Sequence, residues 1–251
     1  MTVTLRKRDG LLLLVCIGLG LTCVRLGLWQ LDRLAQRRAR NARMEERLAL
    51  PPLRLTGGPL DASALEYRHV VTRGAFDLES QVVLVNRALD GVPGVHLLAP
   101  LRLEGTDTAV LVDRGWIPVE DEGPAGQATY ALEGMVEVTG IARLSQPEPL
   151  WSFLRDPIPS PGGPALDSWR VVNLEGLRVQ MPDPLLPVFL QQTEAAAGQL
   201  QPVPDPGIDH SEGPHLSYAI QWFSFAAIAI VGGAAWFRHR RRQATAGGAD
   251  R

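Results

Sequence analysis

Two short stretches of the sequence bring together side chains that could bind a cofactor. In the first, Arg25, Trp29 and Arg33 follow one another at four-residue intervals. In the second, "HLSYAIQWFSF", a histidine precedes three aromatic residues at intervals of three, four and three residues: His215, Tyr218, Trp222 and Phe225. Residues three or four apart lie on one face of a helix. The spacing therefore predicts two helical faces, each with polar and aromatic side chains.

The residue types on these two faces match the needs of a haem group. A neutral imidazole is an axial ligand of haem iron, and arginine pairs with carboxylates such as the haem propionates. Flat aromatic rings can stack on a porphyrin. We therefore consider a haem site in which His215 binds the iron, Arg25 or Arg33 meets a propionate, and aromatic residues flank the ring, namely Trp29, Tyr218 and Trp222.

Each of these residues also has an explanation that requires no cofactor. Tryptophan and tyrosine form belts at membrane surfaces, which accounts for Trp29, Tyr218 and Trp222. Arg25 could extend its charged end to lipid headgroups, and His215 could bond the backbone or solvent at a helix start. Both interpretations stay open on residue types alone. The remaining histidines are expected to be solvated or hydrogen-bonded structural groups: His69, His96, His210 and His239.

The two faces belong to two apolar runs, Leu11 to Trp29 and Leu216 to Phe237. Each has the roughly 20 residues that a helix needs to cross the hydrocarbon core of a bilayer. Basic residues precede the first run, so a cleaved signal peptide is the alternative there, but no small-residue cleavage pattern follows it. We expect two retained transmembrane helices. Because a chain that crosses twice returns to the side it left, Trp29 and His215 are expected at the same membrane surface.

Small residues in both runs predict direct helix packing, because they let two helix backbones approach closely in lipid. They are Gly18, Gly20 and Gly27 in the first run and Ala219, Ala226, Gly232 and Gly233 in the second. Cys16 and Cys23 lie seven residues apart, about 10 Å along one helix, which is too far for a disulfide within it. We interpret both cysteines as small buried residues.

The chain between the two runs has the pattern of a β domain. Five runs rich in β-branched residues are bounded by Gly, Pro and Asp, as in "YRHVVTRGAF" and "TAVLVDRGWIP", and each predicts a strand. Such a succession favours an antiparallel barrel or sandwich. We also expect a bulge at Gly140, a short helix between Asn173 and Pro182, and a final strand in "LLPVFLQQTE".

The expected architecture is therefore that of a membrane protein: two transmembrane α-helices flank a mainly β (α+β) extramembrane domain, an antiparallel barrel or sandwich with a short helix. The expected parts are an N-terminal tail 1–10, a first transmembrane helix 11–29, a helical extension 30–50, a β-rich domain 51–201, a Pro/Gly linker 202–214, a second transmembrane helix 215–237 and a basic tail 238–251. Within the domain, "SFLRDPIPSPGGPALDSW" is expected to form a long loop because it is rich in Pro and Gly.

Charge and motif content argue against several classes of function. A formal net charge of -2 carries no bulk electrostatic signature of a nucleic-acid binder. The sequence has no Walker loop, no GxSxG, no HExxH and no dinucleotide-binding glycine set. We therefore expect no nucleic-acid partner and no enzymatic activity, although a membrane-anchored enzyme of another type stays open.

Four motifs follow one another along the chain: "LGLWQLDR" from Leu26, "YRHVVTRGAF" from Tyr67, "VLVDRGWIP" from Val110 and "HLSYAIQWF" from His215. In this order they resemble the Surfeit-locus (Surf/Shy) family of cytochrome c oxidase assembly factors. The resemblance extends from about residue 18 to residue 240. Many relatives have asparagines before the histidine and a threonine before the second tryptophan, where this chain has Gly213-Pro214 and Gln221.

The resemblance implies a protein of the bacterial cytoplasmic (inner) membrane, with both termini cytoplasmic and the large domain extracytoplasmic. It implies a role in delivering haem a to oxidase subunit I, with subunit I, the haem a synthesis machinery and membrane lipid as partners. It identifies His215 as the haem residue, Trp29 and Trp222 as the family tryptophans, and Arg114-Gly115 as a family pair. A structural scaffold for oxidase subunits that binds no haem is the alternative.

Overall fold

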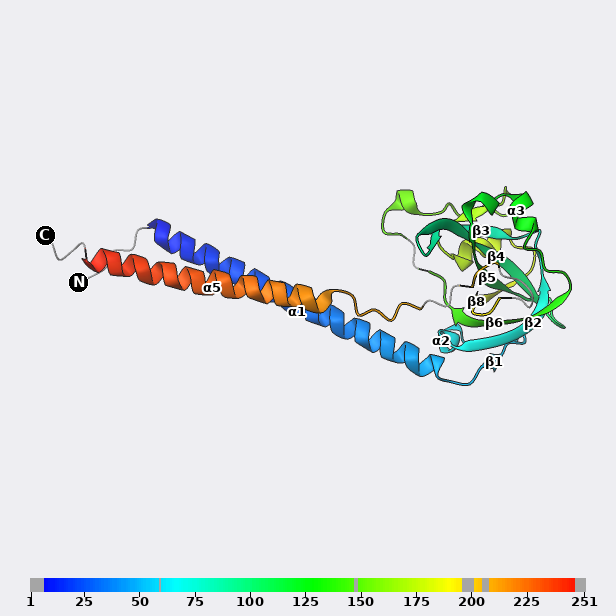
Figure 1. Ribbon diagram of the computed structural model, residues 1–251, viewed down its shortest axis with the longest axis horizontal. Coiled ribbons are helices and arrows are strands. Elements are labelled where there is room, and N and C mark those ends of the chain that lie inside the picture. The colour runs from blue at the N-terminus through cyan, green and yellow to red at the C-terminus, as the bar shows by residue number, and fades with distance from the viewer. Residues whose placement is uncertain (1–6, 59, 147–148, 196–200, 205–207, 247–251) are drawn as a thin grey trace. The chain divides into compact units, whose positions relative to one another are not determined.

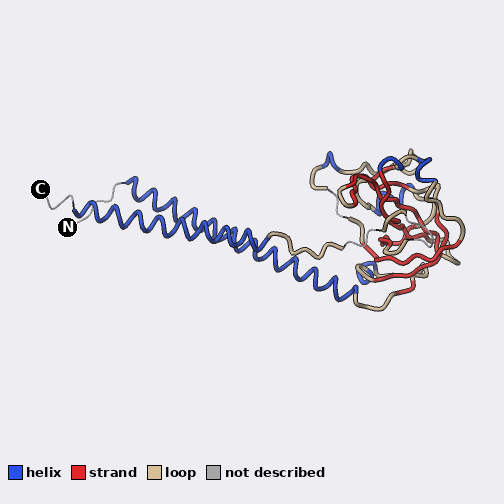
Figure 2. The backbone as a smooth tube through the Cα atoms, in the orientation of Figure 1, coloured by secondary structure: helices blue, strands red, loops and turns tan. Residues whose placement is uncertain are grey.

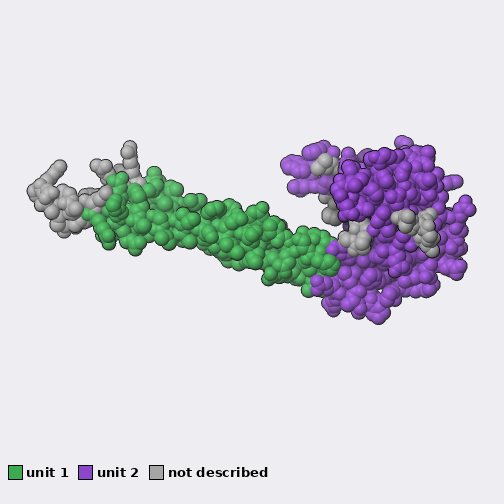
Figure 3. All heavy atoms as spheres, in the orientation of Figure 1, with its two compact units in different colours: residues 1–43, 209–251 green, residues 44–208 purple. Residues whose placement is uncertain are grey.

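The computed structural model describes residues 7–58, 60–146, 149–195, 201–204 and 208–246. The chain divides into two compact units, residues 1–43 with 209–251 and residues 44–208 (Figure 3). Two long helices build the first unit, and strands dominate the second (Figure 2). The elements, in chain order, are α1 Lys7–Leu48, β1 Leu53–Arg54, α2 Ala62–Leu65, β2 His69–Phe76, β3 Val82–Leu89, β4 Val92–Leu103, β5 Ala109–Pro118, η1 Val119–Asp121, α3 Pro124–Ala128, β6 Met135–Arg143, η2 Ser152–Leu154, β7 Ser168–Trp169, α4 Leu174–Gln180, β8 Leu185–Gln192 and α5 His215–Ala246.

Helices α1 and α5 of the first unit are both long and apolar enough to cross a membrane. Helix α1 continues without a break from the apolar run into the polar sequence that follows it, as far as Leu48. Large apolar side chains on both helices face outward; Leu14 is 67% exposed and Ile228 is 68% exposed. Contiguous apolar surface of this kind is unfavourable in water. The two helices therefore indicate a membrane protein.

The two long helices pack side by side along a narrow stripe (Figure 1). On α1 the buried positions recur at intervals of three and four residues: Gly20, Cys23, Gly27, Gln30 and Leu34. On α5 the shielded positions follow the same rule: His215, Ala219, Trp222 and Ala226. This alternation is that of the a and d positions of a coiled coil. We call this stripe the helix seam.

Glycines let the two backbones come close at the helix seam. A side-chain carbon added to Gly27 would lie 2.7 Å from the Phe223 ring, and one added to Gly20 would lie 3.0 Å from Ile230. The small residues of the seam are Gly20, Gly27, Ala219, Ala226 and Gly233. The prediction of packing through small residues is confirmed at these positions. It is wrong at Gly18 and Gly232, where an added carbon would meet no atom within 4 Å.

The second unit is built around a closed barrel. Its strands pair in the order β2-β6-β8-β5-β4, and β4 pairs back with β2. Neighbouring barrel strands are antiparallel except β5 and β8, which are parallel. A parallel pair needs a long crossover, and the chain between these two strands contains η1, α3, β6 and α4. The barrel confirms the expected mainly β domain, and β1, β3 and β7 extend the sheet beyond it.

Apolar residues fill the barrel and also cover part of its outer side. Val110 and Val112 of β5 belong to a core that draws on all five barrel strands. Between them, Leu111 points to a second core, which contains the fully buried Trp169 and residues of α4. Helix α4 begins as expected, because the Asn173 side chain accepts hydrogen bonds from the first backbone N–H groups. Strand β5 is thus buried on both faces.

The expected bulge at Gly140 is wrong. Strands β2 and β6 keep one register from His69–Ile141 to Ala75–Met135, and β8 also pairs regularly through Gly140. A side-chain carbon at Gly140 would lie 2.7 Å from the carbonyl oxygen of Gln191. Glycine is therefore required there by close strand contact. The segment expected to be one long loop also contains η2 and β7.

The Arg-Gly pair is part of the barrel wall. Arg114 is 2% exposed and donates hydrogen bonds to Gln81 Oε1, at 2.8 Å, and to the carbonyl oxygen of Tyr130. Burial lowers the pKa of Arg114 to about 10, so the guanidinium stays charged at neutral pH. Gly115 has a φ of +115°, and a side-chain carbon there would lie 2.2 Å from the carbonyl oxygen of Val203. Both residues shape the barrel.

Oxidation of a Gly233→Cys variant should join that position to the native Cys16. An added carbon at Gly233 lies 3.1 Å from Cβ and 3.4 Å from Sγ of Cys16, so a small outward shift reaches the Cβ separation of about 3.5–4.5 Å found in disulfides. We expect a crosslink within one molecule, detected as a linked peptide pair by mass spectrometry. Gly232→Cys is the matched control and should not crosslink, because that position faces no atom within 4 Å. A crosslink formed only between molecules would contradict the packing of α1 against α5 within one chain. If the first helix were removed as a signal peptide, no crosslink would form.

Gly115→Ala should destabilise the second unit more than Gly105→Ala. Both glycines have positive φ, +115° and +74°, so a side chain at either strains the backbone by about 1–2 kcal/mol. At Gly115 the added carbon also collides with the backbone of Val203, whereas at Gly105 it meets no atom within 4 Å. We expect a loss of about 3 kcal/mol or more in unfolding free energy for Gly115→Ala and about 1 kcal/mol for Gly105→Ala. Thermal unfolding followed by circular dichroism measures both, and equal losses would refute the steric argument.

Candidate functional site

The candidate site lies where the helix seam changes from apolar to polar. Gln30 occupies a seam position of α1 and is 9% exposed, and His215 is the first residue of α5. Nδ1 of His215 lies 2.8 Å from Oε1 of Gln30. On the N-terminal side of Gln30 the seam of α1 contains glycine and cysteine, whereas Leu34, Arg37 and Asn41 follow on its other side. The Gln30–His215 pair therefore marks the start of a section with more polar residues.

The hydrogen bond between His215 and Gln30 decides which imidazole nitrogen is available. Because an amide oxygen can only accept, the bond to Oε1 requires a hydrogen on Nδ1, and the ring in its neutral form then presents the lone pair of Nε2. Gly213 lies beside this second nitrogen, since a side-chain carbon added there would be 3.4 Å from Nε2. Because the residue is glycine, no side chain at position 213 covers that edge of the ring. His215 is thus oriented so that the lone pair of Nε2 can bind a metal ion.

His215 lines a pocket of about 340 Å³ together with four polar residues of α1: Arg33, Gln36, Arg37 and Arg40. We call it the basic pocket. Among the described residues no carboxylate lines it. The planar donor groups of arginine bind carboxylates and phosphates in pairs of hydrogen bonds. The basic pocket therefore suits an anionic group next to the open side of His215.

Contacts beside the basic pocket hold the segment that leads into α5. Three pairs join it to α1: Arg37 to Asp209 at 3.7 Å, Arg38 to Glu212 at 2.7 and 2.9 Å, and the Asn41 side-chain amide to the carbonyl oxygen of His210 at 2.6 Å. The hydrogen bond from Arg38 lowers the pKa of the Glu212 carboxyl, so that pair is fully charged at neutral pH. These contacts fix the place at which His215 begins its helix.

The structure brings together three residues of the predicted haem site. His215 and Arg33 line the same pocket. The Arg33 guanidinium lies 5.7 Å from the centre of the Trp29 ring, within the range of a cation–π interaction. Histidine, arginine and one tryptophan therefore form a continuous group.

Trp29 does not itself line the basic pocket, and the other three predicted residues also lie outside its lining. Trp222 is half-buried in the seam and packs edge-on against Phe225, with ring centres 6.0 Å apart. Tyr218 is 45% exposed, and Arg25 is exposed on α1. Their positions agree with an aromatic and basic belt at a membrane surface.

Sequence reasoning missed Gln30, Arg37 and Arg40. A usable signal was present, because Gln30 continues the three-and-four spacing of the small residues Gly20 and Gly27. An amide in an otherwise apolar stripe needs a hydrogen-bond partner when it is buried. Arg37 and Arg40 gave no comparable signal, since they belong to a run of arginines that any solvated helix could carry.

These residues fit one edge of a haem group. An imidazole with an open Nε2 suits haem iron, and neighbouring arginines suit propionates. The volume of about 340 Å³ is at the small end of ligand pockets. The basic pocket would therefore hold the propionate groups beside His215 but is too small for a whole porphyrin.

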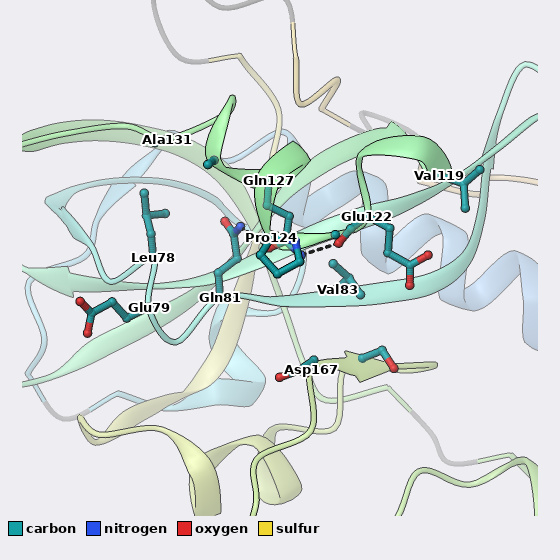
Figure 4. Close-up of a pocket in the computed structure, with 13 residues that line it drawn as sticks. Leu78, Glu79, Gln81, Val83, Val119, Glu122, Pro124, Gln127, Ala131 and Asp167 are labelled. Atoms are coloured by element: carbon teal, nitrogen blue, oxygen red, sulfur yellow. Dashed lines mark hydrogen bonds between the residues drawn. The ribbon is translucent and has the colours of Figure 1, made fainter.

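A larger hollow of about 890 Å³ lies on the second unit (Figure 4). Its lining includes the carboxylates Glu79, Glu122 and Asp167, which disfavour an anionic ligand. Gln81 and Gln127 meet in it through a hydrogen bond of 2.9 Å. In the part of the chain that the structure describes, no group of three or more His, Cys, Asp and Glu side chains could hold a metal ion. The hollow therefore offers no comparable ligand set.

Comparison with known proteins gives a consistent result over most of the chain. The model of the SURF1 family matches residues 17–227. A SURF1-like protein of Monosiga brevicollis is 28% identical over 248 residues, which cover 94% of this chain and 90% of that protein. Surfeit locus protein 1 of Homo sapiens is 24% identical over 253 residues, or 94% and 80% of the two chains. An uncharacterised SURF1-like protein of Mycobacterium bovis is 30% identical over 225 residues, or 86% and 79%. The chain belongs to the SURF1 family.

Proposed function

We propose that the chain is an assembly factor for cytochrome c oxidase that binds haem a transiently and assists its delivery to subunit I. The observation that carries the proposal is the Gln30–His215 hydrogen bond, which leaves Nε2 of a histidine open beside three arginines. Membership of the family supports the general role, because the resemblance described above implies oxidase assembly. Subunit I and the haem a synthesis machinery are the partners that this role requires.

In this proposal each residue of the site has a separate task. Haem a would supply an iron that accepts the lone pair of an imidazole, and His215 would supply that lone pair through Nε2. Gln30 keeps the hydrogen on Nδ1 and holds the ring. The arginines of the basic pocket bind the propionates, and Trp29, beside Arg33, adds an apolar surface. The hydrophobic tail of the cofactor favours the bilayer.

The same geometry suits a carrier that releases its cargo. His215 is half-buried and, among the residues that the structure describes, is the only histidine that lines the basic pocket. The neighbouring pair of Arg37 and Asp209 is solvent-exposed, with 32% and 60% of the side chains accessible, and exposed pairs of this kind are weak. Arg37 can therefore leave Asp209, bind a propionate and later pair with Asp209 again, at a small cost in free energy.

We also propose that the chain carries or positions its cargo and is not an enzyme, since no nucleophile or phosphate-binding motif is present in its sequence. A scaffold for oxidase subunits that binds no haem is the second candidate function. One observation favours it: Asp209 and Glu212 already pair with arginines next to the basic pocket. Their negative charge reduces the attraction that an added anion would feel.

For the topology, we propose that both termini are cytoplasmic and that residues from about 30 to 214 lie outside the bacterial inner membrane. The charge rule favours this orientation only slightly. Seven basic residues lie close to the apolar runs in the two terminal tails, before the first run and after the second. Six lie on the other side, from Arg33 to Arg47. Long domains cross largely regardless of charge, so the family resemblance supplies the main support.

His215→Ala should abolish or shift the absorption of bound haem in protein that is co-expressed with the haem a synthesis enzymes. The iron would lose its imidazole, whereas membrane insertion and strand content should stay unchanged because residue 215 is half-buried at a helix start. His239→Ala, on the same helix, is the matched control and should keep the spectrum. An unchanged haem spectrum in His215→Ala would refute the haem site and favour the scaffold.

A reporter enzyme that is active only outside the cytoplasm should be active when it is joined after Ala142 and inactive when it is joined after Arg242. Ala142 lies in β6 of the second unit and Arg242 follows the second apolar run. Enzyme activity in intact cells measures both fusions. Activity of a cytoplasm-specific reporter after Ala142 would reverse the proposed orientation.

A further inference from the structure

A cluster of large apolar side chains is exposed on the second unit, in the segment between β6 and β7. It contains Leu150 at 85% exposure, Trp151 at 63%, Phe153 at 75% and Ile158 at 53%. We call these four residues the apolar tip. The rings of Trp151 and Phe153 lie 6.2 Å apart, and the helical turn η2 that carries Phe153 stands away from the barrel (Figure 1). Single exposed apolar residues are common, but several large ones within one short segment mark an interaction site.

The apolar tip is held by a well-formed base. The Asp156 side chain accepts hydrogen bonds from the Arg170 backbone N–H at 2.8 Å and from its guanidinium at 3.2 Å. Arg155 donates to the carbonyl oxygen of Pro149 at 3.1 Å and so closes the other end of the segment. The cluster is therefore presented in a defined shape, which reduces the entropy lost when it is covered.

The charges around the apolar tip favour contact with lipid headgroups. Only 4% of the Asp156 side chain is exposed, and its charge is compensated by Arg170. Arg155 lies in the same segment and is exposed. Tryptophan, other apolar side chains and an adjacent cation are the combination that favours the membrane–water interface.

We propose that the apolar tip inserts into the interfacial layer of the bilayer in which the chain's own helices are embedded. The chain supplies this partner itself, because the second unit is joined to an apolar helix at each end. Covalent attachment gives the bilayer a high effective concentration at the tip, so a weak insertion that would be negligible in a free domain becomes significant. The inference rests on the two membrane helices and is independent of haem binding.

The test uses the full chain in nanodiscs of phosphatidylcholine and phosphatidylglycerol, with Cys16 and Cys23 replaced by alanine. Nitroxide labels are placed at Phe153→Cys and Ile158→Cys. Val92→Cys is the matched control, because Val92 and Ile158 are both 53% exposed and both belong to the second unit. Collision of each label with oxygen, which concentrates in lipid, is compared with collision with a water-soluble nickel complex.

We expect the labels at positions 153 and 158 to collide several-fold less with the nickel complex than the label at position 92, and more with oxygen. Nickel access equal to that at position 92 would overturn the proposal. Low access to both reagents would also overturn it, since protein would then cover the tip, either a second copy or another partner. Circular dichroism of each labelled variant verifies the fold. The absorption of bound haem should be unchanged in these variants, which separates this test from that of His215→Ala.

Discussion

The candidate site depends on the close approach of two helix backbones. At Gly20 and Gly27 the partner helix occupies the space in which a side chain would stand. Because the backbones touch there, the helix seam continues with the same three-and-four spacing as far as Gln30 and His215, which meet at hydrogen-bond distance. In lipid, where apolar surface gives no driving force for association, such packing is the main attraction between helices. Larger residues at the two glycines would separate the imidazole from its amide partner.

The second unit is organised around a different close contact. Gly115 leaves room for the segment that returns from the barrel, and Trp116 and Val203 exchange two backbone hydrogen bonds of 2.8 Å. Next to them, the buried Arg114 ties Gln81 to the carbonyl oxygen of Tyr130. The family pair Arg114-Gly115 therefore has a structural task. His96 is similar, since its Nδ1 lies 3.0 Å from Asp113 in the barrel wall, as expected for a satisfied histidine.

The elements could be read from the sequence because their signals are local. Apolar length predicted the two helices, β-branched runs bounded by turn residues predicted the strands, and Asn173 predicted the start of α4. The task of Gln30 depends on contact with a residue 185 positions away, and no local pattern sets that register. The parallel pairing of β5 with β8 and the regular register at Gly140 are likewise properties of the assembled sheet. Arg37 and Arg40 join His215 only because the lead-in to α5 folds back onto α1.

The position along α1 at which polar residues enter the helix seam, at Gln30, makes the site sensitive to the thickness of the bilayer. The apolar run from Leu11 to Trp29 is about 28 Å long as a helix, which is close to the hydrocarbon thickness of a typical bilayer. In a bilayer with longer acyl chains, either the membrane thins around the protein or the polar part of the seam is drawn into hydrocarbon. Longer acyl chains are thus expected to reduce the hydration of the His215 ring, and shorter chains to increase it, with no change in the sequence.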